Sequence, residues 1–379
     1  MSITRRTLLS ASALLLARPG AARAQAAAES VIHPAVDARP APLVLCWNEN
    51  PYGPSPAARA VMSGTVSASC RYPEDEIPVL MDVLAKKEGL SAEHIVTGSG
   101  SGELLCALGG MIARNGGEII SAEPTYLEMT GYAKNHGASI KTVPVDAALK
   151  HDLKAMRAAV SERTRAMYIC NPNNPTGTAV PRAQIVELAM SLPPEVLLIV
   201  DEAYMDFADD PAVGSVAELV KSGRRIVVLR TFSKIHGMAG VRCGYAITRP
   251  DIAAELTDAR QATPNLFAMR AAVASLGDTA FLKDTRQRII ASRQRILREL
   301  QSLQLAYAAP QGNFVFFDTG MPLADFTAKM LARNIRVGRR FPPYDNWCRI
   351  TVGREPEVDA FITALRAIRT EHGTAKKVG

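Results

Sequence analysis

The sequence lacks several features that mark other classes of protein. No cluster of lysine and arginine with interleaved aromatic residues stands out, so nothing supports nucleic-acid binding. Internal repeats are absent, and the most apolar N-terminal run, at residues 11–17, is too short to cross a bilayer as a permanent helix. Hydrophobic residues make up 47% of the chain and charged residues 21%, which is typical of a globular protein with a large core. We also expect no metal ion.

A short basic and apolar segment begins the chain. Arg5 and Arg6 precede the apolar run, and Ala22-Arg-Ala24 provides the small residues of a cleavage site. This layout predicts a signal peptide over residues 1–24 that is cleaved after Ala24. The paired arginines resemble a twin-arginine signal, which carries folded proteins. We therefore expect a periplasmic protein without stable membrane association after cleavage; the alternatives are a plain secretory signal or a disordered basic tail. Cleavage would remove four arginines and no acidic residue, lowering the formal net charge from +7 to +3.

The six cysteines are scattered and contain no CxxC pair. An exported protein can form disulfides. Four of the cysteines nevertheless lie in apolar runs typical of a core, where cysteine acts as a small hydrophobic residue. We expect free buried thiols at Cys106, Cys170, Cys243 and Cys348.

Apolar strands alternate with helices through the first two thirds of the chain. The predicted strands are residues 95–97, 118–121, 139–143, 166–170, 196–200 and 225–230. Such alternation indicates an α/β fold in which a mostly parallel sheet is covered by helices on both faces, a three-layer arrangement.

The pattern changes after Tyr245. A long helix is predicted over residues 285–303, followed by short strands and a closing helix over residues 357–369, which indicates a smaller α+β domain. The predicted division is an arm at 25–48, a large domain at 49–265 and a small domain at 266–379. A chain of this length can form one large and one small hydrophobic core.

One stretch, Thr231-Phe-Ser-Lys-Ile-His-Gly-Met-Ala-Gly-Val-Arg242, carries the strongest chemical signal. It follows the predicted strand at 225–230 and places Lys234 at the strand end, beside glycines that allow a sharp turn. The Ser233 hydroxyl and the Arg242 guanidinium suit a phosphate group. We interpret Lys234 as the lysine that forms a Schiff base with pyridoxal phosphate.

Further polar residues follow successive strands at the edge where open parallel sheets bind ligands. Asp201 can hold the proton on the pyridine nitrogen of the cofactor, and Asn174 and Tyr204 can stabilise the ring hydroxyl anion. Ser101 and Gly102, in a glycine-rich turn that begins a helix, offer backbone N–H groups to the phosphate. Taken singly, each residue has a structural explanation in a turn, a cap or a core. Lys234, once displaced, can move the substrate Cα proton.

The motifs NPNNPTG, DEAY, TFSK and RCGY resemble those of the class I/II aminotransferases of fold type I, and NENPYGPS, RYPE, GSGSGELL and CRITVG are most similar to the histidinol-phosphate aminotransferase branch. The resemblance implies a homodimer in which Tyr72 reaches the cofactor phosphate of the partner subunit. It also implies that Tyr126 stacks on the ring and that Arg349 binds the substrate carboxylate. Tyr52 and Asn174 are implied as further substrate contacts.

The sequence departs from the pattern of that branch at two places that would bind phosphate groups, one of the cofactor and one of the substrate. Gly102 stands where those enzymes usually have Asp, and either Arg336 or Arg339 could be the arginine for a substrate phosphate. Because histidine biosynthesis is cytoplasmic and this chain carries an export signal, we predict that histidinol phosphate is not its natural substrate.

The leading hypothesis is therefore transfer of an amino group from an amino acid to a 2-oxo acid. One alternative is a decarboxylase or lyase with the same cofactor, resembling threonine-phosphate decarboxylases. The other is an inert secreted binding protein, against which the intact Lys234, Asp201 and Arg242 argue.

Overall fold

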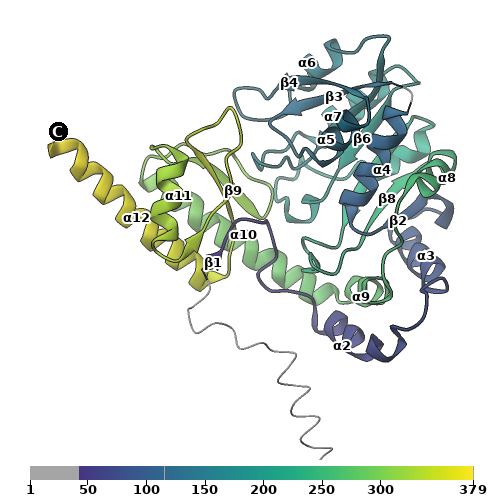
Figure 1. The fold of residues 1–379 in the computed structure, drawn as a ribbon, viewed down its shortest axis with the longest axis horizontal. Coiled ribbons are helices and arrows are strands. Elements are labelled where there is room, and N and C mark those ends of the chain that lie inside the picture. The colour runs from purple at the N-terminus through teal and green to yellow at the C-terminus, as the bar shows by residue number, and fades with distance from the viewer. Residues whose placement is uncertain (1–41, 115, 379) are drawn as a thin grey trace, which may run out of the picture. The chain divides into compact units, whose positions relative to one another are not determined.

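The computed structural model describes residues 42–378 apart from Asn115, with side chains through His372. The predicted signal peptide and the predicted arm up to residue 41 lie outside the described residues. From Leu43 onward the chain forms one compact unit (Figure 1). None of the helices in residues 42–378 combines the length and the apolar character that crossing a membrane requires.

A seven-stranded sheet forms the centre of the larger region. Its strands are β2 (Ile95–Gly98), β3 (Glu118–Glu123), β4 (Ser139–Pro144), β5 (Thr164–Cys170), β6 (Leu197–Asp201), β7 (Ile226–Thr231) and β8 (Gly244–Thr248). Their order is β2-β8-β7-β6-β5-β3-β4. Strand β8 runs antiparallel to β2 and β7, whereas the other neighbours pair in parallel. The mostly parallel sheet expected from the sequence is confirmed, with β8 as an unpredicted strand.

Alternate residues of the central strands enter two different cores. In β6, Leu197 and Ile199 face one core, and Leu198 and Val200 face the other. Each such buried side chain stabilises the fold by about 1.5–3 kcal/mol. The first core is covered by α4 (Ser101–Ala113), α5 (Glu128–Asn135) and α8 (Pro250–Ala259). The second is covered by α2 (Pro56–Thr65), α3 (Glu76–Glu88), α6 (Leu153–Ala158), α7 (Arg182–Ser191) and α9 (Leu266–Gly277).

A smaller α+β region surrounds a third core. It contains β1 (Leu43–Val44), β9 (Phe314–Asp318), β10 (Ile335–Arg336), β11 (Trp347–Thr351), α10 (Thr279–Ser302), α11 (Leu323–Leu331) and α12 (Glu355–Val378). Strands β9 and β11 pair antiparallel, and β1 pairs in parallel with β10. The predicted boundary at residue 265 stays a prediction, and α9 beyond it packs against α2 and α3. The 3-10 helices are η1 (Val66–Ala68), η2 (Ala92–His94), η3 (Met205–Phe207) and η4 (Ala217–Ser222).

The cysteines lie in different surroundings. Cys170, Cys243 and Cys348 are buried, as the apolar runs around them predict. Cys106 is only half-buried, because its side of α4 lines a surface hollow together with Arg114.

Candidate active site

Lys234 lies just after β7, where the chain turns sharply at the carboxyl edge of the sheet. The backbone N–H of Ser233 donates to Oγ1 of Thr231 at 3.1 Å, and the N–H of Gly237 donates to the carbonyl of Lys234 at 3.0 Å. Gly237 has φ +69°, and a Cβ there would collide with the backbone of Gly53. Glycine is therefore required at this position for the turn that presents the lysine.

The Lys234 amine is held against two backbone carbonyls. Its Nζ donates to the oxygen of Asn48 at 3.1 Å and to that of Trp47 at 3.4 Å. Burial lowers the pKa of Lys234 to about 8, and the nearby Arg349 guanidinium acts in the same direction. The amine is therefore deprotonated more readily than an ordinary lysine, as attack on a carbonyl carbon requires.

Asp201 ends β6, is buried and lines the same cavity as Lys234. Its Oδ1 accepts a hydrogen bond from the backbone N–H of Ala203 at 3.0 Å, and its Oδ2 accepts one from the hydroxyl of Tyr168 at 3.2 Å. Burial raises the pKa of Asp201 to about 6, although both hydrogen bonds oppose the rise. The carboxylate therefore stays ionised at neutral pH and provides a buried negative charge.

Amide and guanidinium groups surround the Tyr204 hydroxyl. Nδ2 of Asn48 donates to it at 3.1 Å and Nδ2 of Asn174 at 3.5 Å. Nη1 of Arg349 donates to Oδ1 of Asn174 at 2.6 Å. Burial raises the pKa of Tyr204 above its usual value, so the phenol remains a proton donor. Together these groups form a polar wall that can donate hydrogen bonds to an anionic oxygen.

The N-terminus of α4 lies near Arg242. Gly100 precedes the helix, and no side chain caps the N–H groups of its first turn. Arg242 adopts φ 66°, and its Nη1 donates to the carbonyl of Ala239 at 3.0 Å and to Oγ of Ser233 at 3.4 Å. A Cβ added at Gly100 would collide with the Arg242 guanidinium. The helix end and the guanidinium therefore provide converging positive charge, which suits a phosphate.

One cavity of about 280 Å³ collects most of the predicted residues. Those that line it are Ser101, Gly102, Tyr126, Asn174, Asp201, Tyr204, Ser233, Lys234, Arg242, Arg339 and Arg349. They come from segments far apart in the sequence and meet at the carboxyl ends of the strands, as expected for an open parallel sheet.

Three predicted residues lie elsewhere. Tyr72 is 92% exposed, and the Tyr52 ring lies 5.7 Å from the guanidinium carbon of Arg288. Arg336 lines a neighbouring cavity of about 570 Å³, which shares Trp47, Arg339 and Arg349 with the first. Of the two candidates for a substrate phosphate, Arg339 is therefore the one that lines the same cavity as Lys234.

Six lining residues were not predicted as site residues. Ala203, Thr231 and Ala239 lie in stretches that carried the prediction, and the other three are Trp47, Asn48 and Glu128. Asn48 and Trp47 reach the cavity through the segment after β1, and only the NENP motif signalled that segment. Glu128 is the third, and the Tyr126 hydroxyl donates to its carboxylate. A Cβ added at Gly102 would lie 2.8 Å from both Glu128 carboxylate oxygens, so the glycine makes room for this side chain.

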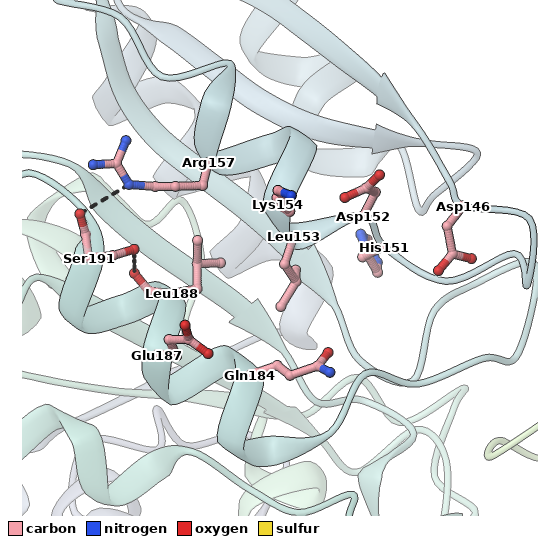
Figure 2. Close-up of a pocket in the computed structure, with 10 residues that line it drawn as sticks. All are labelled: Asp146, His151, Asp152, Leu153, Lys154, Arg157, Gln184, Glu187, Leu188 and Ser191. Atoms are coloured by element: carbon pink, nitrogen blue, oxygen red, sulfur yellow. Dashed lines mark hydrogen bonds between the residues drawn. The ribbon is translucent and has the colours of Figure 1, made fainter.

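A larger hollow of about 610 Å³ opens beside α6 and α7, as Figure 2 shows. Its charged walls carry both signs: Asp146, Asp152, Lys154, Arg157 and Glu187. Nε of Arg157 donates to the Ser191 carbonyl at 3.0 Å, and the Ser191 hydroxyl donates to the Leu188 carbonyl at 2.9 Å (Figure 2). Among its described lining residues, none was predicted for the site. The smaller cavity is therefore the candidate active site.

The donor set of that cavity fits pyridoxal phosphate, the cofactor predicted from the sequence. The buried Asp201 carboxylate suits the pyridinium nitrogen, and the amide and hydroxyl groups around Tyr204 suit the ring hydroxyl. The Arg242 guanidinium suits the phosphate. One group opposes the fit. The Glu128 carboxylate borders Gly102 at the phosphate end, so its side chain would have to rotate away from a bound phosphate.

Comparisons with known proteins agree with this chemistry. Residues 41–365 match the family described as Aminotransferase class I and II. A histidinol-phosphate aminotransferase of Moorella thermoacetica is 36% identical over 328 residues, which cover 86% of this chain and 84% of that protein. An aromatic amino acid aminotransferase of Rhodococcus jostii is 35% identical over 327 residues, which cover 85% of this chain and 89% of that protein.

Solved structures show the same fold. Histidinol-phosphate aminotransferase from Sinorhizobium meliloti, in complex with pyridoxal-5'-phosphate, superimposes with a TM-score of 0.78 at 28% identity, covering 98% of this chain and 99% of that one. L-threonine-O-3-phosphate decarboxylase from Porphyromonas gingivalis has a TM-score of 0.73 at 19% identity, covering 86% of this chain and 99% of that one. At that identity, the likeness to the decarboxylase concerns the fold alone.

Proposed function

The chain belongs to the class I and II aminotransferases, which use pyridoxal phosphate, and we propose that its amino donor is an α-amino acid whose carboxylate binds Arg349. Arg349 carries this proposal. Its side chain is 7% exposed, and its hydrogen bonds go to Oδ1 of Asn174 and to the Cys46 carbonyl, neither of which is acidic. A buried guanidinium without an anionic partner in the described chain is costly unless a ligand completes it.

The other side chains then have distinct tasks. The bound cofactor supplies an electron sink for the negative charge that develops at the substrate Cα. The Lys234 amine holds the cofactor and moves the Cα proton. The Asp201 carboxylate keeps the ring nitrogen protonated, and the Asn174 and Tyr204 groups bind the ring oxygen. Arg242, Ser233 and the first turn of α4 bind the phosphate.

The substrate class can be tested by turnover. We expect purified holoenzyme to transfer amino groups from common amino acids to 2-oxoglutarate or pyruvate faster than from histidinol phosphate. Arg349→Ala should raise KM for the amino acid about 100-fold, because a hydrogen-bonded charged pair contributes about 1.5–3 kcal/mol. Arg349→Lys should recover only part of this loss, since lysine lacks the forked donors.

The same assay separates transfer from decarboxylation. Release of a 2-oxo acid supports transfer, whereas release of carbon dioxide from the amino acid would contradict it. Faster turnover of histidinol phosphate than of every amino acid tested would overturn the proposed substrate class. In that case Arg339, which shares the cavity with Lys234, is the first residue to substitute, with Arg336→Ala as the matched control.

We further propose a homodimer in which Tyr72 completes the site of the partner subunit. The support is its 92% exposure, which leaves the phenol free to contact a second chain. Mixing Tyr72→Ala with Lys234→Ala subunits should restore activity, because one hybrid site then carries both intact residues. Absence of any recovery after subunit exchange would contradict the shared site.

Export through a twin-arginine signal is also proposed, from residues 1–24. Replacing both Arg5 and Arg6 by lysine should leave the protein in the cytosolic fraction, whereas the natural sequence should yield mature periplasmic protein beginning at Gln25. Unprocessed protein found only in the cytosol would refute this proposal.

A further inference from the structure

We propose that Phe341 is a positioning residue for substrate binding, because its ring holds the guanidinium groups of Arg349 and Arg339 beside the cavity that contains Lys234. Phe341 itself does not belong to the lining of either cavity described above, so it acts through the two arginines. This inference rests on the proposed function, since it takes Arg349 as the group that binds the substrate carboxylate.

One aromatic ring lies close to both guanidinium groups. The guanidinium carbon of Arg339 is 4.4 Å from the centre of the Phe341 ring, and that of Arg349 is 4.9 Å from the same centre. The faces of an aromatic ring carry partial negative charge, and a cation within about 6 Å of the ring centre is attracted to it. Because the Phe341 side chain is buried, water weakens this attraction little. The ring therefore makes a favourable contact with each arginine.

The hydrogen bonds that these two arginines donate go to neutral acceptors. Nη1 of Arg339 donates to the Arg340 carbonyl at 3.1 Å. Arg349 donates to the amide oxygen of Asn174 and to the Cys46 carbonyl. Burial lowers the pKa of Arg349, and repulsion by the Arg339 charge acts in the same direction. A carboxylate here would offset that repulsion but compete with the substrate, whereas a neutral aromatic ring offsets part of it and leaves both guanidinium groups able to bind an anion.

Phe341 is held in place by the same pair of strands that carries Arg349. Its ring packs edge-on against Phe316, with the ring centres 6.1 Å apart and the ring planes at 88°. Phe316 on β9 pairs directly with Arg349 on β11, so these two side chains lie on one face of the sheet. The backbone N–H of Gly338 donates to the Arg349 carbonyl at 3.0 Å, which ties the segment before Phe341 to β11. The ring and the Arg349 guanidinium are therefore fixed relative to each other.

The first experiment weakens the negative charge on the ring face and keeps the shape of the ring. Phe341 is replaced by 3,4,5-trifluorophenylalanine, whose fluorine atoms withdraw electrons from the ring. The matched control is the same replacement at Phe361, which is buried as well but packs edge-on against Phe317, with ring centres 6.2 Å apart, instead of against a guanidinium group. The dissociation constants of hexanoate and of the uncharged hexanamide are measured by calorimetry on the holoenzymes. Hexanoate should bind about tenfold more weakly in the Phe341 variant, hexanamide should bind as before, and the Phe361 variant should match the natural enzyme for both.

Turnover provides a second measurement that a loss of packing alone would not reproduce. With the amino donor that the natural enzyme uses fastest and with 2-oxoglutarate, the fluorinated Phe341 enzyme should show a KM for the donor raised about tenfold and a nearly unchanged kcat. The reason is that the arginines bind the carboxylate equally in the substrate and in the transition state. Phe341→Leu should raise KM at least as much, and Phe361→Leu is its control.

Unchanged hexanoate binding in the fluorinated Phe341 enzyme, or an equal loss in the fluorinated Phe361 enzyme, would overturn the role of Phe341. Arg349→Ala separates that result from a failure of the proposed function. If Arg349→Ala weakens hexanoate binding and fluorination of Phe341 does not, only the positioning role fails. If Arg349→Ala leaves hexanoate binding unchanged, the proposed function fails and the positioning role fails with it.

Discussion

The hydroxyl of Tyr168 donates a hydrogen bond to Oδ2 of Asp201 at 3.2 Å, beneath the candidate active site. Tyr168 lies on β5 and Asp201 ends the adjacent β6, and both side chains are buried. Backbone N–H of Ala203 satisfies the other carboxylate oxygen. In the proposed site, where Asp201 binds the cofactor, the phenol would act through that carboxylate as a positioning residue.

Tyr168→Phe removes this hydrogen bond while keeping the ring. Because the bond lowers the pKa of Asp201 against the effect of burial, its loss should raise that pKa from about 6. The carboxylate would then be protonated at a higher pH, and the acid limb of the kcat/KM profile should move upward. A hydrogen bond to a charged group contributes about 1.5–3 kcal/mol, so activity near pH 6 should fall about tenfold or more.

The control is Tyr245→Phe. That buried hydroxyl binds the carboxylate of Glu88 at 2.9 Å instead of Asp201, so its loss should leave the acid limb in place. An unshifted profile in Tyr168→Phe would show that the phenol has only a packing role.

Cofactor uptake should depend on the protonation of Lys234. The pKa of this amine is lowered to about 8, so its neutral fraction grows as the pH rises through that value. Mixing apoenzyme with pyridoxal phosphate at a series of pH values, and following the absorbance of the attached cofactor, should give a midpoint near 8. An ordinary lysine, with a pKa of 10.5, would give a much higher midpoint.

A second variant tests how much Arg349 contributes to the lowered pKa of Lys234. Arg349→Ala removes a neighbouring positive charge, so the midpoint should move toward higher pH, and Lys234→Ala should not develop the absorbance at all. A midpoint near that of a free lysine in the natural enzyme would contradict the buried position of the amine.

Glu128→Gln should strengthen cofactor binding. The Glu128 carboxylate borders Gly102 at the phosphate end of the cavity, where like charges repel. The neutral amide keeps the shape and removes the repulsion, so the apoenzyme should bind pyridoxal phosphate several-fold more tightly, a gain of about 1 kcal/mol at partial exposure. Pyridoxal, which lacks the phosphate, is the control ligand and should show no gain. Equal effects on both ligands would place Glu128 away from the phosphate.

Arg293 should be important for stability. It is fully buried on α10, pairs with Asp209 at 2.7 Å, and donates to the carbonyl of Gly312 at 2.8 Å. Arg293→Ala leaves the Gly312 carbonyl without this donor and opens a cavity, which should lower the free energy of unfolding by about 3–5 kcal/mol in a urea titration.

Arg295→Ala is the matched control on the same helix. Arg295 pairs with Asp359 at the surface, where a single ion pair contributes about 1 kcal/mol or less. If the two substitutions lowered the free energy of unfolding equally, burial of Arg293 would not explain its contribution to stability.

Local patterns in the sequence were sufficient for most of the sheet and for the cofactor end of the site. Apolar runs predicted β5, β6 and β7, because a strand buried on both faces needs apolar residues at nearly every position. The carboxyl ends of these strands must meet at one edge, so Asp201 and Lys234 could be placed together. Strand β8 was not predicted, because five residues after a sharp turn carry little periodic signal.

Those local patterns could not predict contacts between distant segments. Asn48 donates to Tyr204 across 156 positions of the chain, and Arg349 donates to Asn174 across 175. Neither pairing follows from periodicity, because each depends on how the third core docks against the end of the large sheet. The choice between Arg336 and Arg339 likewise depends on packing, since Arg336 ends β10 and Arg339 lies three residues later in the same short segment.

The sequence by itself determined the α/β alternation, the lysine at the end of β7 and the chemistry of its neighbours, since these depend on side-chain type and local spacing. Only the tertiary structure decided which residues share the cavity with Lys234. It placed Trp47, Asn48 and Glu128 there, put Arg339 in that cavity and Arg336 in the next, and left Tyr72 in solvent. The physical reason is that burial and distance between remote segments arise from packing, which no local stretch of the chain encodes.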